Sequence, residues 1–245
     1  MIHALKPPCP VCGNGDSKQI NFVENNCRVC RIQCEECKTI YFDRRPPYET
    51  EYNLEYNQHF YRPGDIRKAG IMAAEIAKIA LMKYFGATIL EAGTGNGLTI
   101  FLLKQMGIYA EGLDIDEKLA EYLRSTLDIK IHVSRFETWK TDLEYSIIYS
   151  SHVIEHSDNP SGFLRKALSL LHPGGLLYLE TPDIKYRTLY GPRWRHFATR
   201  DPYEHITLLS TQGLYSMLGT IGFTEIRIDS IQEYQILRAT AEKPK

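Results

Sequence analysis

Short apolar runs alternate with longer stretches of helical periodicity over most of the chain after residue 88. The apolar runs predict buried strands at 88–91, 109–113, 130–133, 146–149 and 176–180. Between them, apolar residues at helical spacing predict helices at 98–106, 118–127 and 163–171. Strands that alternate with helices through short loops are typical of a parallel sheet with helices on both faces. We therefore expect an α/β fold built on a doubly wound, mostly parallel sheet.

The regions on either side of this core carry further patterns. The aspartate at 65 is a candidate cap for a helix over 66–85. The Pro-Gly-Gly sequence at 173–175 predicts the end of the helix that precedes the strand at 176–180. Near the carboxyl end, the pattern predicts a helix at 210–219 and strands at 223–228 and 234–239.

All six cysteines lie within residues 9–37, which favours a metal site over scattered disulfides. Cys9 and Cys12 form a C-x-x-C pair followed by a glycine, the composition of a zinc knuckle. Two later pairs, at 27/30 and at 34/37, have the same spacing. The pair at 34/37 leaves 21 residues between the knuckles, close to the spacing of zinc ribbons. We favour a structural zinc ion held by Cys9, Cys12, Cys34 and Cys37.

Two prolines, Pro46 and Pro47, follow the cysteine-rich segment and interrupt regular backbone pairing. They predict a linker between two domains. We expect a zinc-ribbon head over residues 1–45 and an α/β domain over residues 46–245.

A glycine-rich loop, Glu91-Ala-Gly93-Thr94-Gly95-Asn-Gly97, follows the strand predicted at 88–91. Alternate glycines let a backbone turn sharply and lie against a ligand. A dinucleotide fingerprint requires a third glycine at position 98, where this chain has leucine, so a dehydrogenase is disfavoured. An aspartate, Asp114, follows the next predicted strand, where a carboxylate can accept hydrogen bonds from both hydroxyls of a ribose.

Charge and hydropathy narrow the classes of function. The formal net charge is -1, from 29 basic and 30 acidic residues, whereas a dedicated nucleic-acid binder usually has a basic excess. The sequence contains no run of the roughly 20 apolar residues that a membrane helix needs, and its first residues lack the apolar region of a secretory signal. We expect a cytoplasmic protein that does not enter a membrane, and the charge balance disfavours nucleic acid as its substrate.

Several motifs in the order found here resemble those of class I S-adenosylmethionine-dependent methyltransferases, which have a Rossmann-like fold. The glycine loop at 91–97 is similar to the first motif of that family, and Gly112-Leu-Asp114-Ile-Asp116 to its second-strand acid. The segments at 151–160 and 171–182 are similar to its fourth-strand and Pro-Gly-Gly segments. One departure is Ser146, at the start of the fourth strand, where the family usually has aspartate.

The resemblance implies a binding site for S-adenosylmethionine. The glycine loop would face the methionine part of the cofactor, Asp114 would bind the ribose, and Ile115 would pack on the adenine. Glu91 would help hold the loop and the amino group, and Arg135 and Phe136 would lie beside the adenine edge. The residues expected at the cofactor are Glu91, Gly93, Thr94, Gly95, Gly97, Asp114, Ile115, Arg135, Phe136 and Ser151.

Histidines supply the candidate chemistry of transfer. His152 lies beyond the fourth strand, where open α/β sheets place their ligands. Tyr203-Glu204-His205 resembles the His-Glu-His segment of zinc-headed sugar methyltransferases, where a Glu-His pair serves proton transfer; here the first histidine is tyrosine. The resemblance implies His205 as a general base oriented by Glu204, with His152 as a further candidate.

Three functions remain in competition at this point. The leading hypothesis is methyl transfer to a hydroxyl of a small, sugar-like or other metabolite. Arginines and aromatic residues alternate over 187–200, which is one reason to expect an anionic acceptor. The alternatives are an RNA or nucleobase methyltransferase that docks through the ribbon, and a non-catalytic cofactor-binding scaffold.

Overall fold

The computed structural model describes residues 7–24, 27–42, 63–190 and 205–245. The chain divides into two compact units, and each is described by itself. The first unit comprises Met1–Thr50, His152–Arg165 and Leu179–Ala241. The second unit comprises Glu51–Ser151, Lys166–Tyr178 and Glu242–Lys245.

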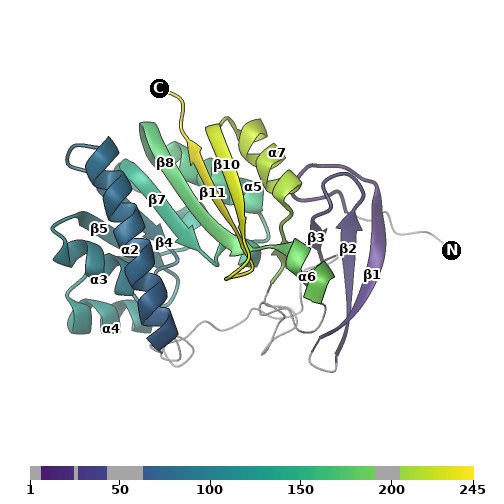
Figure 1. The fold of residues 1–245 in the computed structure, drawn as a ribbon, viewed down its shortest axis with the longest axis horizontal. Helices are drawn as coiled ribbons and strands as arrows, with labels where there is room; N and C mark the ends of the chain where they lie inside the picture. The colour runs from purple at the N-terminus through teal and green to yellow at the C-terminus, as the bar shows by residue number, and fades with distance from the viewer. Residues whose placement is uncertain (1–6, 25–26, 43–62, 191–204) are drawn as a thin grey trace. The chain divides into compact units, whose positions relative to one another are not determined.

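The second unit contains the predicted βαβ repeats (Figure 1). Strand β4 pairs in parallel with β5 on one side and with β7 on the other, and β5 pairs in parallel with β6. The complete sheet has seven strands in the order β10-β11-β8-β7-β4-β5-β6, which confirms the expected mostly parallel α/β fold. The elements of these repeats are α2 (Pro63–Lys83), β4 (Thr88–Ala92), α3 (Leu98–Gln105), β5 (Tyr109–Asp114), α4 (Glu117–Leu127), β6 (Ile131–Val133), the short 3-10 helix η1 (Phe136–Thr138) and β7 (Tyr145–Ser151).

Apolar side chains pack the helices α2, α3 and α4 against this part of the sheet. One core cluster joins the buried face of α2 to strands β4 and β7, and includes Met72, Ile76, Ile89 and Ile147. A second cluster joins α3, α4 and β6, and includes Leu119. Helix α3 contributes Leu103 to the first cluster and Ile100 to the second, so α2, α3 and α4 pack on the same face of these strands.

Two predicted boundaries in this unit are wrong. Helix α2 begins at Pro63, so Asp65 lies in its first turn and does not cap it. Proline is well placed at the first helical position because its missing N–H has no partner there in any helix. The Pro-Gly-Gly sequence does not end helix α5 (Pro160–Leu170) but lies inside strand β8 (Leu171–Pro182). The backbone of Gly174 and Gly175 exchanges hydrogen bonds with Lys243, which fixes the position of this segment.

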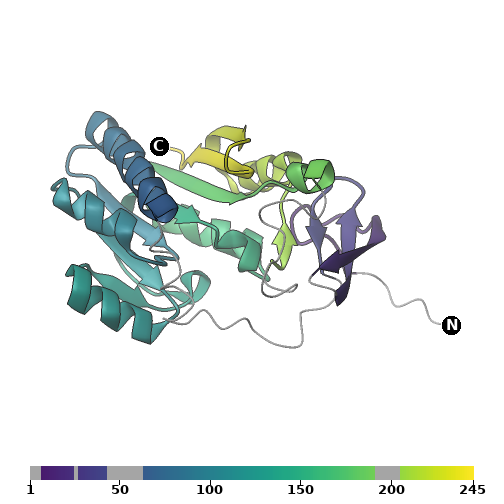
Figure 2. The ribbon, with the colours of Figure 1, turned by 60° about the horizontal axis from the view of Figure 1, so that its bottom comes forward.

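The first unit contains a four-stranded sheet in the order β1-β2-β3-β9. Its first strands, β1 (Ser17–Glu24) and β2 (Cys27–Cys34), form an antiparallel pair, drawn in purple in Figure 2. No strand was predicted in this segment. Strand β3 (Ile40–Tyr41) follows the last cysteine pair. The fourth strand, β9 (Thr207–Leu208), comes from the carboxyl-terminal part of the chain. The proposed boundary at residue 45 stays a prediction, because residues 43–62 lie outside the described part of the chain.

The remaining elements of the first unit follow the predicted order closely. Helix α7 begins after Ser210, whose hydroxyl accepts a hydrogen bond from the Gly213 amide, and ends at Gly222. Helix α6 was not predicted. Within the described residues, no helix has the length and apolar character to cross a membrane. The elements are η2 (Ile154–His156), α6 (Ile184–Tyr190), α7 (Thr211–Ile221), β10 (Thr224–Ile231) and β11 (Ile236–Glu242).

Candidate active site and cysteine cluster

The glycine loop between β4 and α3 turns back on the end of β5. The amides of Gly93 and Thr94 donate to the carbonyl of Leu113, at 2.8 and 3.2 Å. Gly95 and Gly97 have φ angles of 53° and 71°, in the left-handed region that favours glycine. The loop thus presents backbone at a place where other residues would present side chains. The positive φ angles explain the glycines at these two positions, and their role in ligand binding stays a prediction.

Two carboxylates stand at this loop, and each is only partly used by the protein. Asp114 accepts hydrogen bonds from the amides of Gly95 and Ile115, at 3.2 and 2.8 Å. Glu91 is buried, and its Oε2 has no hydrogen-bond partner among the described residues. Burial, together with the nearby charge of Asp114, raises the pKa of Glu91 well above its usual range. A buried acid of this kind accommodates a cationic group, such as the amino group of a bound amino acid.

The other residues predicted at the cofactor are placed as follows. Ile115 is 51% exposed, an unusual state for an isoleucine and one that leaves it available to a flat ring. Arg135 is exposed, whereas Phe136 is buried in the core. Thr94 is buried, and its hydroxyl donates to the Leu113 carbonyl. Ser151, the last residue of β7, accepts a hydrogen bond from Lys68 on α2 at 3.4 Å.

Ser146, the departure from the usual aspartate, has a packing role. Its hydroxyl accepts a hydrogen bond from the Thr88 amide at 3.2 Å, and its own amide donates to the Thr88 hydroxyl at the same distance. These bonds tie the start of β7 to the start of β4. The structural role at the start of the fourth strand is therefore retained with a different side chain.

In the first unit, the neighbours Glu155 and His156 lie close to His205, which is 50 residues after Glu155 in the sequence. A carboxylate oxygen of Glu155 and one ring nitrogen of each histidine lie within 4.8 Å of one another. The centroids of the two histidine rings are 5.1 Å apart. His152 joins them, because its Nδ1 lies 3.2 Å from the Glu155 carboxylate. The other Glu155 oxygen accepts a hydrogen bond from the Thr181 hydroxyl at 2.9 Å. His152 and His205 are thus brought to one buried acid.

The charge states in this cluster follow from burial and from the neighbouring groups. Burial alone would raise the pKa of Glu155, but the hydrogen bond from His152 and the nearby His156 and His205 outweigh it and lower the pKa to about 2. Burial, and then the nearby His156, lower the pKa of His205 well below its ordinary value. His205 is therefore neutral and Glu155 is charged at neutral pH.

The expected partner of His205, Glu204, lies outside the described residues. The described carboxylate at His205 is Glu155, which sequence reasoning missed. Arg187, expected in an acceptor-binding segment, is 8% exposed on α6, so its side chain is largely taken up by the fold. The rest of the segment at 191–200 is not described.

The four cysteines chosen from the sequence form one cluster in the first unit. The Sγ atoms of Cys9 and Cys37 are 3.6 Å apart, and those of Cys12 and Cys34 are 3.5 Å apart. Disulfide sulfurs are separated by about 2.05 Å, whereas four thiolates around zinc at about 2.3 Å are separated by about 3.8 Å. The spacing therefore fits a tetrahedral metal site. Because Cys30, of the alternative pair, is exposed, it does not enter this cluster.

The two cysteine pairs are held in matching turns. The amide of Gly13 donates to the Cys9 carbonyl at 2.9 Å, and the amide of Lys38 donates to the Cys34 carbonyl at 3.2 Å. Gly13 and Lys38, the residues after each second cysteine, both have a positive φ, of 74° and 62°. Lysine is less favourable than glycine at this angle. The second knuckle thus has the same backbone turn as the first, but no glycine marks it in the sequence.

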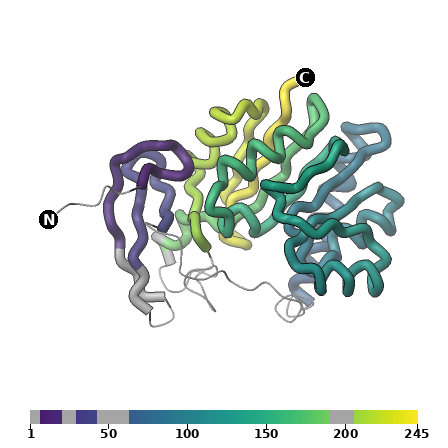
Figure 3. The backbone as a smooth tube through the Cα atoms, turned by 180° about the vertical axis from the view of Figure 1, so that it is seen from behind, coloured from purple at the N-terminus to yellow at the C-terminus, as the bar shows by residue number. Residues whose placement is uncertain are grey.

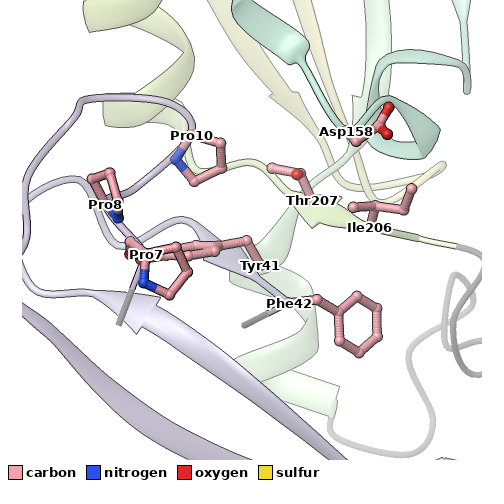
Figure 4. A pocket seen from close by; sticks show the side chains of 8 residues that line it. All are labelled: Pro7, Pro8, Pro10, Tyr41, Phe42, Asp158, Ile206 and Thr207. Atoms are coloured by element: carbon pink, nitrogen blue, oxygen red, sulfur yellow. Dashed lines mark hydrogen bonds between the residues drawn. The ribbon is translucent and has the colours of Figure 1, made fainter. Parts of the chain in front are cut away.

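A pocket of about 160 Å³ opens in the first unit between the cysteine-rich head and the segment after His205 (Figure 4). Tyr41 and Phe42 contribute aromatic rings, and Asp158 contributes the single acidic side chain among the lining residues. The prolines lie on one side and Ile206 and Asp158 on the other. The lining residues are Pro7, Pro8, Pro10, Tyr41, Phe42, Asp158, Ile206 and Thr207.

Comparison with known proteins places this chain in a family. The methyltransferase domain family matches residues 64–227, and the chain belongs to it. A protein of Mycolicibacterium smegmatis described as a probable S-adenosylmethionine-dependent methyltransferase is 30% identical over 173 residues, which cover 65% of this chain and 67% of that protein. The chain is thus an S-adenosylmethionine-dependent methyltransferase, and the expected class of enzyme and its cofactor are confirmed.

Other relatives match over shorter regions. The ubiquinone biosynthesis O-methyltransferase of Paramagnetospirillum magneticum is 31% identical over 103 residues, and the match spans 40% of this chain and 41% of that protein. A solved S-adenosylmethionine-dependent methyltransferase from Archaeoglobus fulgidus covers 78% of this chain and 99% of its own, with a TM-score of 0.58 and 16% identity. A chain from the complex of the Haloferax volcanii Trm112 methyltransferase activator with a methyltransferase has a TM-score of 0.59, 18% identity and coverage of 78% and 98%. These structures show the shared fold alone.

Proposed function

We propose that this enzyme transfers a methyl group from S-adenosylmethionine to a hydroxyl of a small-molecule acceptor, with His205 as the general base. The observation that carries the proposal is the cluster of His205, His156 and the buried Glu155. A histidine held neutral beside a charged carboxylate can accept a proton and stabilise the charge it gains. The similarity of part of the chain to an O-methyltransferase supports an oxygen acceptor.

The residues at the glycine loop fit the cofactor. The unpaired oxygen of Glu91 suits its amino group, Asp114 suits the ribose hydroxyls, and the exposed Ile115 suits one face of the adenine. S-adenosylmethionine supplies an activated methyl group, so the protein has to align the acceptor, exclude water and remove one proton. Alignment is therefore the main catalytic task of this chain's own residues.

The pocket beside His205 supports a small acceptor. Its aromatic rings offer faces against which a ring can stack, and Asp158 and Thr207 offer hydrogen-bonding groups to hydroxyls. The only charged residue of its lining is an acid, and Arg187 is largely buried, so the described residues favour a neutral, hydroxylated ring over an anion. An RNA acceptor has less support because the net charge of the chain is -1.

The cysteine cluster is proposed to hold one structural zinc ion through Cys9, Cys12, Cys34 and Cys37. Four thiolates complete the coordination of zinc and leave no position for a substrate. The spacing of the sulfur atoms and the matching turns support this assignment. The zinc ion would stabilise the head and take no part in methyl transfer.

The cofactor site gives the first test. S-adenosylmethionine at 100 times its Kd should add about 2.7 kcal/mol to the free energy of unfolding and raise the Tm by about 5–10 °C. Asp114→Ala should raise the Kd at least about 10-fold, because it removes charge-assisted hydrogen bonds to the ribose. Asp142→Ala, a change at an exposed acid of the same unit, is the matched control and should leave the Kd unchanged. Calorimetry that gives equal affinities for the two variants would remove Asp114 from the site.

A further inference from the structure

The head is joined by backbone pairing to the segment that carries His205. Strand β9 begins two residues after His205 and pairs antiparallel with β3, with Tyr41 opposite Thr207 and Ile40 opposite Leu208. Figures 1 and 3 show these parts of the first unit side by side. Strand β3 itself begins three residues after Cys37, one of the proposed zinc ligands. The course of the chain after His205 is therefore set by the head.

A buried arginine of the head reaches His205 directly. Arg31 on β2 is 1% exposed, and its Nη1 donates a hydrogen bond to the backbone carbonyl of His205 at 2.6 Å. Its guanidinium group also lies over the Phe42 ring, 4.1 Å from the centroid. Burying a guanidinium costs free energy that only well-placed partners offset. The buried guanidinium group of Arg31 therefore holds the backbone carbonyl of His205 in place.

A second connection holds the segment after β9. The Ser210 hydroxyl donates to the carbonyl of Cys37 and accepts from the amide of Gly213, so the cap of α7 is bonded to the second knuckle. A Cβ atom at Gly213 would lie 2.5 Å from the Thr39 hydroxyl, which shows how closely α7 approaches the head. His205 is therefore followed by a segment anchored to the head at 207–208, 210 and 213.

The position of Arg31 also bears on the charge of His205. The groups that act on this histidine are His152, Glu155, His156 and Arg31. Burial lowers the pKa of His205 most, and the nearby His156, Arg31 and His152 act in the same direction. Glu155 acts in the opposite direction. A general base must be neutral before it accepts a proton, so a nearby guanidinium favours the competent state.

We infer that Arg31 is a positioning residue for the general base, and that the head is a working part of the active site because it holds His205 in place. This inference rests on the proposed function of His205. Loss of the cysteine-bound metal would release β3 and Arg31, and with them His205.

The test compares Arg31→Gln and Arg31→Lys with Lys18→Gln, which removes an exposed charge from the neighbouring strand β1. Arg31→Gln should lower kcat at least about 10-fold while the Kd of S-adenosylmethionine and the KM of the acceptor change less than about 2-fold, because only alignment of the base is lost. In a plot of kcat against pH, the rise on the acid side (the acid limb) should move to higher pH in this variant. Arg31→Lys, which retains the charge, should restore the acid limb and part of kcat, and Lys18→Gln should behave as wild type.

A second readout does not need the acceptor. NMR titration of the His205 ring should give a higher pKa in Arg31→Gln than in wild type, with one zinc ion retained per chain. An unchanged pKa and an unchanged kcat in a folded, zinc-loaded Arg31→Gln protein would overturn the inference. If Arg31→Gln does not fold, the same titration is carried out on Arg31→Lys, which retains the positive charge and should keep the wild-type pKa of His205. A raised pKa in folded, zinc-loaded Arg31→Lys would overturn the inference. A shifted pKa together with full activity of His205→Ala would instead reject the proposed function and leave the contact intact.

Discussion

We expect Cys34→Ser to abolish metal binding and to unfold the head, because structural zinc in small domains contributes on the order of 10 kcal/mol to folding. Cys34 is fully buried, and its carbonyl and amide both enter the second knuckle, so serine leaves three thiolates without a complete site. Metal analysis of protein purified without chelator is expected to find one zinc ion per wild-type chain and none in the variant. Because β3 pairs with β9, activity should fall with the metal.

The matched control for this experiment is Cys30→Ser. Cys30 is an exposed cysteine on β2 and lies outside the four-cysteine cluster. The Cys30→Ser variant should therefore keep one zinc ion per chain and the wild-type Tm. Zinc retained in Cys34→Ser and lost in Cys30→Ser would show that the metal is held by the other cysteine pair, and zinc-free wild-type protein would remove the metal site altogether.

We expect His205→Ala to lower kcat by about 100-fold or more, which is the usual size of general-base catalysis. The Kd of S-adenosylmethionine should stay within about 2-fold of wild type, since the glycine loop, Glu91 and Asp114 are untouched. Wild-type kcat should rise with pH through the pKa of His205 and then level off. Because burial lowers that pKa, the acid limb lies well below pH 6.5, and at neutral pH the rate is already maximal.

Kinetics of His205→Ala across this pH range provide the check. The acid limb should vanish in the variant, because the titrating base has been removed. His172→Ala, which removes an exposed histidine paired with Glu144, should leave kcat and the profile unchanged. Full activity of His205→Ala on the true acceptor would contradict the proposal and would direct attention to His152, which lies against the same carboxylate.

The sequence predicted the features that depend on neighbouring residues. The strands at β4, β5 and β7 and the helices between them follow from local periodicity, and the glycine loop from residues within one turn. The start of α2 was misplaced because Asp65 is as suitable in a first turn as at a cap. The Pro-Gly-Gly segment was misassigned because its place in the sheet depends on hydrogen bonds to Lys243, 68 or more residues away.

The candidate site was predictable only in part, for a related reason. The cysteine cluster follows from spacing, and Asp114 from its distance to the glycines. Glu155 has no local signature, because its role arises when folding brings it to His205, 50 residues later. Arg31 is one of several basic residues on a strand until its burial and its bond to a carbonyl 174 positions away are seen. Contacts of this kind depend on tertiary structure.

The central claim is that the methyl group goes to a hydroxyl of a small molecule, and the direct measurement is the fate of a labelled methyl group. Purified enzyme is incubated with methyl-labelled S-adenosylmethionine and a cell extract separated into metabolite, RNA and protein fractions. We predict that label enters the metabolite fraction, that mass spectrometry places one added methyl group on oxygen, and that Asp114→Ala loses the signal. Label in the RNA or protein fraction, or on nitrogen or carbon of a metabolite, would contradict the account.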